Sequence, residues 1–379
     1  QYYKYKYEDK ARRREIGCFC TACRCNGRFC VRFSSCNLLE SVFSGQEGVD
    51  SRSDGGHDYA ALLGGWMGMI DDDVPVTDIV MPGSHDSGTY GMLFLGETQS
   101  LSFGDQMRSG ARYFDVRIRR TGEGELHFYH GILTSENGYG DFLSDTVRFL
   151  EENPTEFLIL DYQHRDPAGD REFGNTLFSM LLDALGEERI LCAPDGMSDL
   201  DYVDSLTLGE ARGKVLVTFG ADARSTDYDF VMVRDSDGGT RAGSVLHSPY
   251  DERNDVQSEE YVNRVFGEYI AQYSAYDGGI CVLQTQLLAG NDNGFVPQSM
   301  EEVHDPNVTA WIKSCKDDPD LLAALNVIMR DYLTPRKCID IIELNKYKNF
   351  VAEEHASAFD ALVAADDDIA DAIVTDGDL

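Results

Sequence analysis

The sequence predicts an α/β fold in which a closed barrel of parallel strands is surrounded by helices, a (β/α)8 or TIM barrel. From about residue 75 onward, short apolar runs alternate with longer amphipathic segments, and each run ends in polar residues. Strands that are apolar throughout are typical of a parallel sheet covered on both faces. Eight such runs within about 275 residues match the spacing of a (β/α)8 barrel.

Seven of the eight strands can be placed from the apolar runs. In chain order, they lie at residues 79–81, 111–118, 126–131, 157–163, 214–220, 279–286 and 325–333. We expect the eighth within residues 228–247. Helices are predicted between the strands, for example over 141–154, which ends at Pro154, and over 171–186, which ends at Gly186. A doubly wound open sheet is the alternative, but no glycine-rich phosphate turn follows the first run.

The two ends of the chain lack this pattern. Residues 1–56 show neither helical nor strand periodicity and contain six of the ten cysteines, so we expect a flexible, cysteine-rich extension. The cysteines could bind zinc, form disulfides or carry acyl chains, but no second pair stands at zinc-finger spacing. We assign residues 57–350 to the barrel and 351–379 to an acidic tail.

The charge balance limits the partners. With 33 Lys and Arg against 67 Asp and Glu, the chain has a formal net charge of −34. This argues against nucleic acid, whose phosphates need a basic surface, and against electrostatic docking on an anionic membrane. We expect no transmembrane helix, because no run of 18 apolar residues occurs, and we see no signal peptide. The chain is therefore expected to be soluble or peripheral to a membrane.

The candidate site residues are the polar side chains that end the apolar runs, since a TIM barrel carries its active site at the C-terminal ends of its strands. These are His85, Asp86, Asp115, Arg117, His130, Asp161, Gln163, Gln284, Gln286 and Asp331. Although Ser84 precedes His85 and Asp86, sequence neighbours do not form a serine-hydrolase triad, so we expect Ser84 to be a turn hydroxyl. His127 and His130 face opposite ways and should not chelate one ion.

Two histidines and an arginine suit the cleavage of a phosphodiester. One neutral imidazole accepts a proton from an attacking hydroxyl, a second donates one to the leaving oxygen, and the guanidinium neutralises the phosphate. A metal-dependent phosphodiesterase would need several carboxylates around a cation, whereas Arg117 stands where one of them could have been. We therefore expect neither a required metal nor another cofactor.

Four segments resemble, in order and spacing, the X domain of the bacterial-type phosphatidylinositol-specific phospholipases C. They are MPGSHDSGT (81–89), ARYFDVRI (111–118), HFYHG (127–131) and FLEENPTEFLILDYQH (149–164). A weaker match lies at 325–345, so that the resemblance covers about residues 75–346. It implies a distorted TIM barrel of the phospholipase C-like phosphodiesterases. It also implies an inositol phospholipid at a membrane surface as the partner, cleaved to diacylglycerol and a cyclic inositol phosphate.

The resemblance also implies the residue roles. His85 would be the general base for the inositol 2-hydroxyl, and His130 the general acid for the diacylglycerol oxygen. Arg117 would bind the phosphate with Asp86 paired to it. Asp331 would hold the ring of His85.

The substrate-binding set is expected to comprise Asp115, Asp161, Gln163, Gln284 and Gln286. The bacterial enzymes carry an Asp and a Tyr where Gln284 and Gln286 stand. The substrate therefore stays open among a phosphoinositide, a glycosylphosphatidylinositol anchor and another phosphodiester lipid. Calcium-binding family members have acidic ligands, one of which Arg117 replaces here. The apolar residues 92–95 could touch lipid or form a helix packed on the barrel.

Two other functions stay open. The first is a catalytically silent X domain that binds a lipid or a protein, although the intact pair of histidines argues against it. The second is a metal-dependent enzyme resembling the glycerophosphodiesterases, which chelation by EDTA would distinguish.

Overall fold

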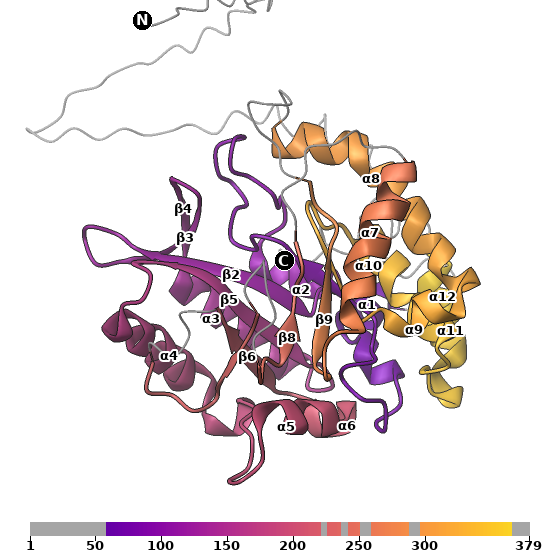
Figure 1. Cartoon of the computed structure of the whole chain (residues 1–379), viewed down its shortest axis with the longest axis horizontal. Coiled ribbons are helices and arrows are strands. Elements are labelled where there is room, and N and C mark those ends of the chain that lie inside the picture. The colour runs from indigo at the N-terminus through magenta and orange to yellow at the C-terminus, as the bar shows by residue number, and fades with distance from the viewer. Residues whose placement is uncertain (1–57, 221–225, 236–241, 251–258, 288–295, 366–379) are drawn as a thin grey trace, which may run out of the picture. The chain divides into compact units, whose positions relative to one another are not determined.

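The computed structural model describes residues 58–220, 226–235, 242–250, 259–287 and 296–365, and the predicted barrel is confirmed (Figure 1). Eight parallel strands follow one another around it in chain order, and the last pairs with the first. They are β1 (Met81–Ser84), β2 (Tyr113–Arg120), β5 (Leu158–Asp166), β6 (Val215–Phe219), β7 (Val231–Val233), β8 (Leu246–His247), β9 (Ile280–Gln284) and β10 (Val327–Arg330). Between β7 and β8 the pairing reduces to one bridge, Arg234 with Leu246, which distorts the barrel.

Residues 126–131 are not a barrel strand, contrary to our prediction. They form β3 (Leu126–His130), which pairs antiparallel with the end of β2 and with β4 (Leu133–Gly138). The resulting hairpin projects beyond the barrel (Figure 1). The missing barrel strand comes from residues 228–247, which supply both β7 and β8 where we expected one strand. The prediction failed because an apolar run indicates a strand and says nothing about its direction.

The first strand begins two residues later than predicted, and its middle residue is a glycine for a steric reason. In β1, Gly83 lies between β2 and β10, and a Cβ atom there would lie 2.9 Å from Cδ1 of Tyr113 and 3.0 Å from Cγ1 of Val327. The α-carbon of Met329 would lie only 3.2 Å away. Glycine therefore lets β1 fit between its two neighbours.

Helices cover the outside of the barrel, and the two that we predicted individually are present. Those before β7 are α1 (Tyr59–Gly64), α2 (Phe103–Arg108), α3 (Tyr139–Glu152), α4 (Arg171–Leu185), α5 (Asp199–Ser205) and α6 (Leu208–Ala211). Those after β8 are α7 (Glu259–Tyr273), α8 (Pro297–Ser314), α9 (Pro319–Ala324), α10 (Pro335–Ile342), α11 (Leu344–Tyr347) and α12 (Ala356–Val363). The side chain of Asp170 caps α4 by accepting a hydrogen bond from Phe173 N, and the helix stops at Gly186, whose φ is +79°.

The boundary that we predicted at residue 350 falls inside the packed unit. Helix α12 buries Phe359 and Leu362 completely in the same hydrophobic core as α1 and the barrel strands. An acidic tail can therefore begin only after residue 365. Residues 366–379 and the cysteine-rich extension over 1–56 lie outside the described residues. Within the described ranges, no helix has both the length and the apolar character needed to cross a bilayer.

We expect Gly83→Ala to destabilise the fold by about 1–3 kcal/mol, because the added methyl group must displace packed atoms of two neighbouring strands. Urea unfolding followed by circular dichroism measures the change. Gly140→Ala in α3 is the matched control: its Cβ would meet no atom within 4 Å, so we expect no loss and a gain of up to about 1 kcal/mol. Equal loss in both variants would contradict the steric argument.

Candidate active site

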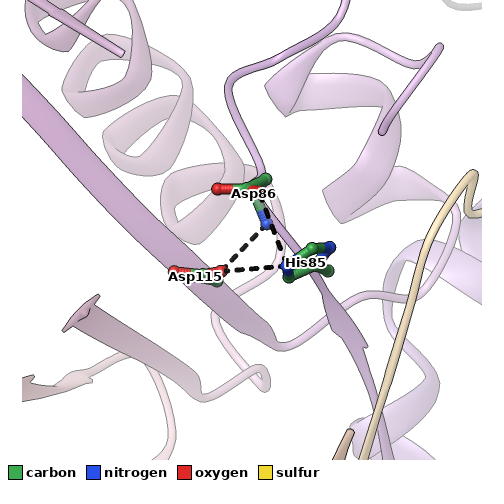
Figure 2. A group of neighbouring side chains, drawn as sticks. All are labelled: His85, Asp86 and Asp115. Atoms are coloured by element: carbon green, nitrogen blue, oxygen red, sulfur yellow. Dashed lines mark hydrogen bonds and ion pairs between the residues drawn. The ribbon is translucent and has the colours of Figure 1, made fainter. Parts of the chain in front are cut away.

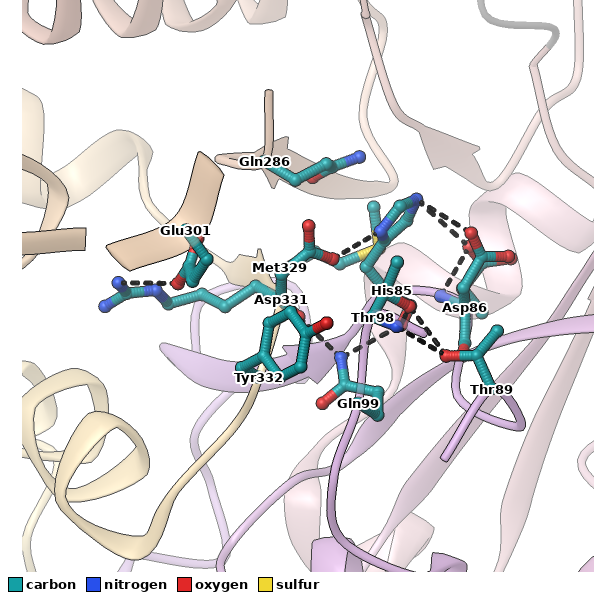
Figure 3. A network of polar contacts seen from close by, with 12 residues as sticks. His85, Asp86, Thr89, Thr98, Gln99, Gln286, Glu301, Met329, Asp331 and Tyr332 are labelled. Carbon is teal, nitrogen blue, oxygen red and sulfur yellow. Dashed lines mark hydrogen bonds and ion pairs between the residues drawn. The ribbon is translucent and has the colours of Figure 1, made fainter. Parts of the chain in front are cut away.

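Parallel pairing of β1 with β10 brings His85 and Asp331 together at the end of the barrel. In the register, Ser84 lies opposite Arg330, so the next residue of each strand follows side by side. The imidazole Nδ1 of His85 lies 2.6 Å from Oδ1 of Asp331. The buried side chain of Gln99 strengthens this junction, since its amide nitrogen donates to the carbonyls of His85 and Arg330, both at 2.9 Å (Figure 3).

Two buried carboxylates hold the guanidinium of Arg117 beside the His85 ring. Its Nε lies 2.7 Å from Oδ1 of Asp86, and its Nη2 lies 2.7 Å from Oδ2 of Asp115. Nη2 also donates to Oε1 of Gln163 at 2.8 Å and lies 3.2 Å from Nε2 of His85. Both carboxylates are fully shielded from solvent, so the cation compensates charges that would otherwise be costly to bury.

The carboxylate of Asp86 lies between the two imidazoles. Its Oδ2 is 3.4 Å from Nε2 of His85 and 3.6 Å from Nε2 of His130. The two Nε2 atoms are therefore no farther apart than the sum of those distances. Asp86 adopts a φ of +45° after the end of β1, and its amide donates to Oδ2 of Asp115 at 3.0 Å (Figure 2). The resulting arrangement has one anionic group in contact with two imidazoles and one guanidinium.

The ring of His130 is oriented by the loop that follows β1. Its Nδ1 lies 3.0 Å from the carbonyl oxygen of Gly96. Because a carbonyl only accepts, Nδ1 carries a hydrogen and Nε2 is the atom that faces Asp86. The ring is part-buried, with 29% of its side chain exposed.

The surrounding charges make His85 a strong base. Burial lowers its pKa, but the carboxylates of Asp331 and Asp86 outweigh burial and raise the pKa from 6.5 to about 9. Arg117 opposes them in part. The pKa of Asp115 changes in the other direction: although burial raises it, Arg117 and His85 hold it below the usual value for an aspartate.

The cluster opens into a cavity of about 620 Å³ at the mouth of the barrel. Its lining includes the ionisable residues His85, Arg117, His130 and Asp331, and also Gln163, Gln284, Gln286 and Tyr250. Leu95, Ile132, Leu133, Leu287 and Pro297 add an apolar rim. The cavity thus combines ionisable groups, neutral amides and an apolar edge.

Residues 74–228 match the family model PI-PLC X, and they contain the two histidines and the arginine of the cluster. This part of the chain is therefore similar to the PI-PLC X domains.

Relatives of this X domain include bacterial enzymes and animal proteins. The chain is 33% identical over 100 residues to the 1-phosphatidylinositol phosphodiesterase of Staphylococcus aureus, covering 25% of this chain and 32% of that protein. It is 28% identical over 137 residues to the human PI-PLC X domain-containing protein 3, covering 27% of this chain and 42% of that protein. The matches therefore span about a third of the bacterial relatives and under half of the animal ones.

Solved structures share the fold of the X domain. The phosphatidylinositol-specific phospholipase C from Listeria monocytogenes superposes with a TM-score of 0.57 at 17% sequence identity, covering 75% of this chain and 98% of that one. A Staphylococcus aureus phosphatidylinositol-specific phospholipase C gives a TM-score of 0.55 at 20% identity. At these identities the likeness supports the distorted barrel alone.

Most of the side chains predicted for the X-domain site do come together. The five predicted catalytic residues form the cluster above, and three of the predicted substrate-binding residues line the cavity. Gln284 donates to the carbonyl and hydroxyl oxygens of Ser248 and accepts from Nε2 of Gln286. Among the side chains that line the cavity, two buried amide atoms have no hydrogen-bond partner, Nε2 of Gln163 and Oε1 of Gln286. Their side chains line the cavity and have hydrogen-bonding capacity left for a ligand.

Asp115 and Asp161 are not among the residues that line the cavity, so we correct their assignment to substrate binding. Asp115 lies behind Arg117 and holds it in place. Asp161 lies deeper inside the barrel, fully buried, where Tyr113 and Thr218 donate to it at 2.6 and 2.8 Å and Arg234 pairs with it at 3.0 Å. The carboxylate of Asp161 therefore pairs with Arg234 inside the barrel and does not face the cavity.

Some contributors were missed, and Ser84 ends strand β1 instead of lying in the turn that we expected. Ser84 is fully buried and donates to Oε1 of Gln106 at 2.6 Å, away from the cavity. Tyr129, Thr98 and Tyr250 line the cavity but were absent from the predicted set. The position of Tyr129 next to His130 was the one sequence signal available. Nothing in the sequence linked Gln99 to the base, since it lies in a polar loop.

We expect the pKa of His85 to fall when Asp331 is replaced by Asn, because the strongest of the raising carboxylates is removed. Histidine NMR should show the His85 ring titrating near 9 in the unaltered protein and at lower pH in the variant. Asp360→Asn, an exposed partner of Lys346, is the control and should leave the titration unchanged.

The same shift has a consequence for stability. A pKa raised above 6.5 means that this histidine contributes stability that is complete below pH 6.5 and is lost as pH rises through about 9. A titration that is unaffected by Asp331→Asn would contradict this account.

Proposed function

We propose that this X domain is a phosphodiesterase that cleaves phosphatidylinositol, or a closely related inositol lipid, to diacylglycerol and a cyclic inositol phosphate. The observation that carries the proposal is the contact of one anionic oxygen, Oδ2 of Asp86, with Nε2 of both His85 and His130. A substrate phosphate bound at this point would face a base, an acid and the guanidinium of Arg117.

His85 acts as the general base on the substrate's own hydroxyl. Its Nε2 accepts the proton of the inositol 2-hydroxyl while that oxygen attacks phosphorus, and Asp331 stabilises the imidazolium from Nδ1. A pKa of about 9 makes the neutral ring a strong base but leaves it mostly protonated near pH 7. Because the mechanism needs the His85 ring neutral and the His130 ring protonated, we expect turnover to follow a bell-shaped pH profile.

His130 acts as the general acid on the leaving group. Its Nε2 donates a proton to the diacylglycerol oxygen as the bond between this oxygen and phosphorus breaks. Nδ1 stays bound to the carbonyl of Gly96. Arg117 offsets the charge that develops on the phosphate oxygens. The products are neutral diacylglycerol and the inositol 1,2-cyclic phosphate, with one proton moved from the ring hydroxyl to the leaving oxygen through the two histidines.

Neutral amides suit the head group of an unphosphorylated inositol. Nε2 of Gln163 can donate to a ring hydroxyl, and Oε1 of Gln286 can accept from one. Among the described residues that line the cavity there is no lysine, and Arg117 is the one arginine. Additional phosphates on the ring would find no further cation there, so we favour phosphatidylinositol as the substrate.

An apolar rim beside the cavity suits a membrane surface. Of the large apolar side chains exposed in the described part of the chain, Leu93, Phe94 and Leu95 lie on the loop after β1, and Ile132 lies on the tip of the β3–β4 hairpin. Phe94 is 61% and Ile132 is 93% exposed. The loop residues therefore do not form the packed helix that we considered as the alternative. Two apolar tips next to one cavity favour insertion into lipid.

The carboxylates at the site do not favour a metal mechanism. One oxygen or nitrogen from each of His85, Asp86 and Asp115 could converge on an ion, since these atoms lie within 4.8 Å of one another. However, the guanidinium of Arg117 already pairs with both carboxylates, and a divalent cation among them would repel it. The donor set therefore fits a bound arginine better than a metal, and we derive no step through one.

We expect His85→Ala to lower cleavage of phosphatidylinositol in mixed micelles by at least about 10²-fold, because the base is lost. Phosphorus NMR would identify the cyclic phosphate. His127→Ala is the matched control: this histidine contacts the carbonyl of Ser135, does not line the cavity, and should retain turnover. EDTA should leave the rate unchanged.

Each other outcome points to a specific alternative. Turnover that survives in His85→Ala would refute the assigned base. Turnover that EDTA abolishes would favour the metal-dependent enzyme, and binding of phosphatidylinositol without cleavage would favour a silent X domain.

We expect the double substitution Phe94→Ser and Ile132→Ser to weaken partition onto phosphatidylcholine vesicles by roughly 10-fold or more, since burial of each apolar side chain contributes about 1.5–3 kcal/mol. Uncharged vesicles are chosen because the chain carries a formal charge of −34. Vesicle flotation measures the change. Met197→Ser, at an exposed position outside both tips, is the control; equal loss there would contradict the assignment of the rim.

A further inference from the structure

The general acid sits on a part of the hairpin that the barrel does not support directly. Strand β3 pairs with β2 through Leu126, His127 and Phe128 only. Beyond Phe128, the hairpin continues as two strands that pair with each other and turn at Gly131, whose φ is +57°, and Ile132. Besides the contact of its Nδ1 with the carbonyl of Gly96, the position of the His130 ring therefore depends on what holds the hairpin tip.

Arg119 provides a tether for this tip, although no part of the proposed mechanism uses it. Its Nη2 donates to the carbonyl of Gly131 at 2.9 Å, and its Nη1 lies 3.3 Å from the carbonyl of Ile132. The guanidinium also stacks over the ring of Tyr129, 4.3 Å from its centroid. Arg119 thus contacts Tyr129, which precedes His130, and Gly131 and Ile132, which follow it.

The tether is itself fixed to the barrel. Arg119 lies in β2, opposite Asp166 at the end of β5, and its Nε donates to Oδ2 of Asp166 at 2.7 Å. A planar guanidinium can make these contacts at once because its donors point in fixed directions. The side chain is 20% exposed, so water can compete with the contacts only in part.

We propose that Arg119 is a positioning residue for the general acid: it holds the hairpin tip so that Nε2 of His130 faces the scissile phosphate. This rests on the proposed function. The neighbouring Arg120 lies in the same strand but has a purely structural side chain, so it can be compared with Arg119. Its side chain pairs with Asp170 at 3.6 Å and stacks over Phe173, whereas its backbone pairs with Leu126 at the base of the hairpin. It therefore serves as a matched control.

The test compares two soluble substrates that differ in their need for an acid. Dihexanoyl phosphatidylinositol has an alkoxide leaving group that must be protonated, whereas inositol 1-(4-nitrophenyl phosphate) releases a phenolate that need not be. We expect Arg119→Met to lower kcat on the lipid by roughly 10- to 100-fold, as for a misplaced catalytic group, with much less effect on the nitrophenyl ester. His130→Ala should show the same pattern more strongly.

Two further variants serve as an intermediate case and as a control for Arg119→Met. Arg119→Lys keeps a charge beside Asp166 but its single ammonium cannot hold both carbonyls, so its loss should be intermediate. Arg120→Met should lower neither rate. An equal loss on both substrates in Arg119→Met, or no loss on either, would overturn the proposal.

Histidine NMR supplies a readout that does not depend on turnover. The His130 ring should show a fixed Nδ1–H in the unaltered protein and averaging between tautomers in Arg119→Met. If the unaltered protein cleaves neither substrate, the proposed function fails, and this signal alone then decides whether Arg119 positions the ring. An unchanged His130 signal in Arg119→Met would refute the positioning role.

Discussion

The parallel pairing of β1 with β10 is the constraint on which the rest of the site depends. It places His85 and Asp331 one step beyond two adjacent strand ends, where their side chains meet at 2.6 Å. Glycine at position 83 permits this pairing, because any larger residue would force β1 away from its neighbours. Gln99 then bridges the two chain segments just beyond the pairing. The pairing of the barrel strands thus sets the position of His85 relative to Asp331.

Around that junction, the protein concentrates negative charge and balances it with a single guanidinium. Asp86 and Asp115 are fully shielded, and Arg117 pairs with both of them. Asp331 and Asp86 raise the pKa of His85 to about 9, since each of these carboxylates favours the imidazolium. A stronger base removes a hydroxyl proton more readily, but the neutral ring is scarcer at neutral pH. The proposed site therefore combines high basicity with a small population of the reactive, neutral form of His85 near pH 7.

Sequence patterns predicted much of this because the barrel places its chemistry at the ends of apolar runs. His85, Arg117 and Asp331 could be found in that way, and they do lie together. His130 was found in the same way although its run forms a hairpin strand outside the barrel. Asp161 shows the limit of the method: alternation along a strand identifies the face of a residue but not its depth. Two residues make a rise of about 6.7 Å, enough to move Asp161 from the mouth, where Gln163 lies, into the barrel interior.

Other features depended on contacts that no local pattern encodes. The antiparallel direction of β3 follows from its pairing with β2. An apolar run in the sequence does not indicate whether its strand pairs parallel or antiparallel. The short strands β7 and β8 lie in a largely polar segment, so their pairing with longer neighbours defines them better than their own residues do. Arg119 and Gln99 acquire their importance from carbonyl groups distant in the chain.

The location of the Asp86 carboxylate also bears on how the reaction cycle would finish. An anion of the protein already touches both imidazoles and the guanidinium. Any phosphate that enters must displace it, and it can return as soon as the phosphate loosens. We expect this internal competitor to lower the affinity for simple phosphate and sulfate. It also assists the departure of the charged product, so that turnover would not be limited by a site that holds its own product too tightly.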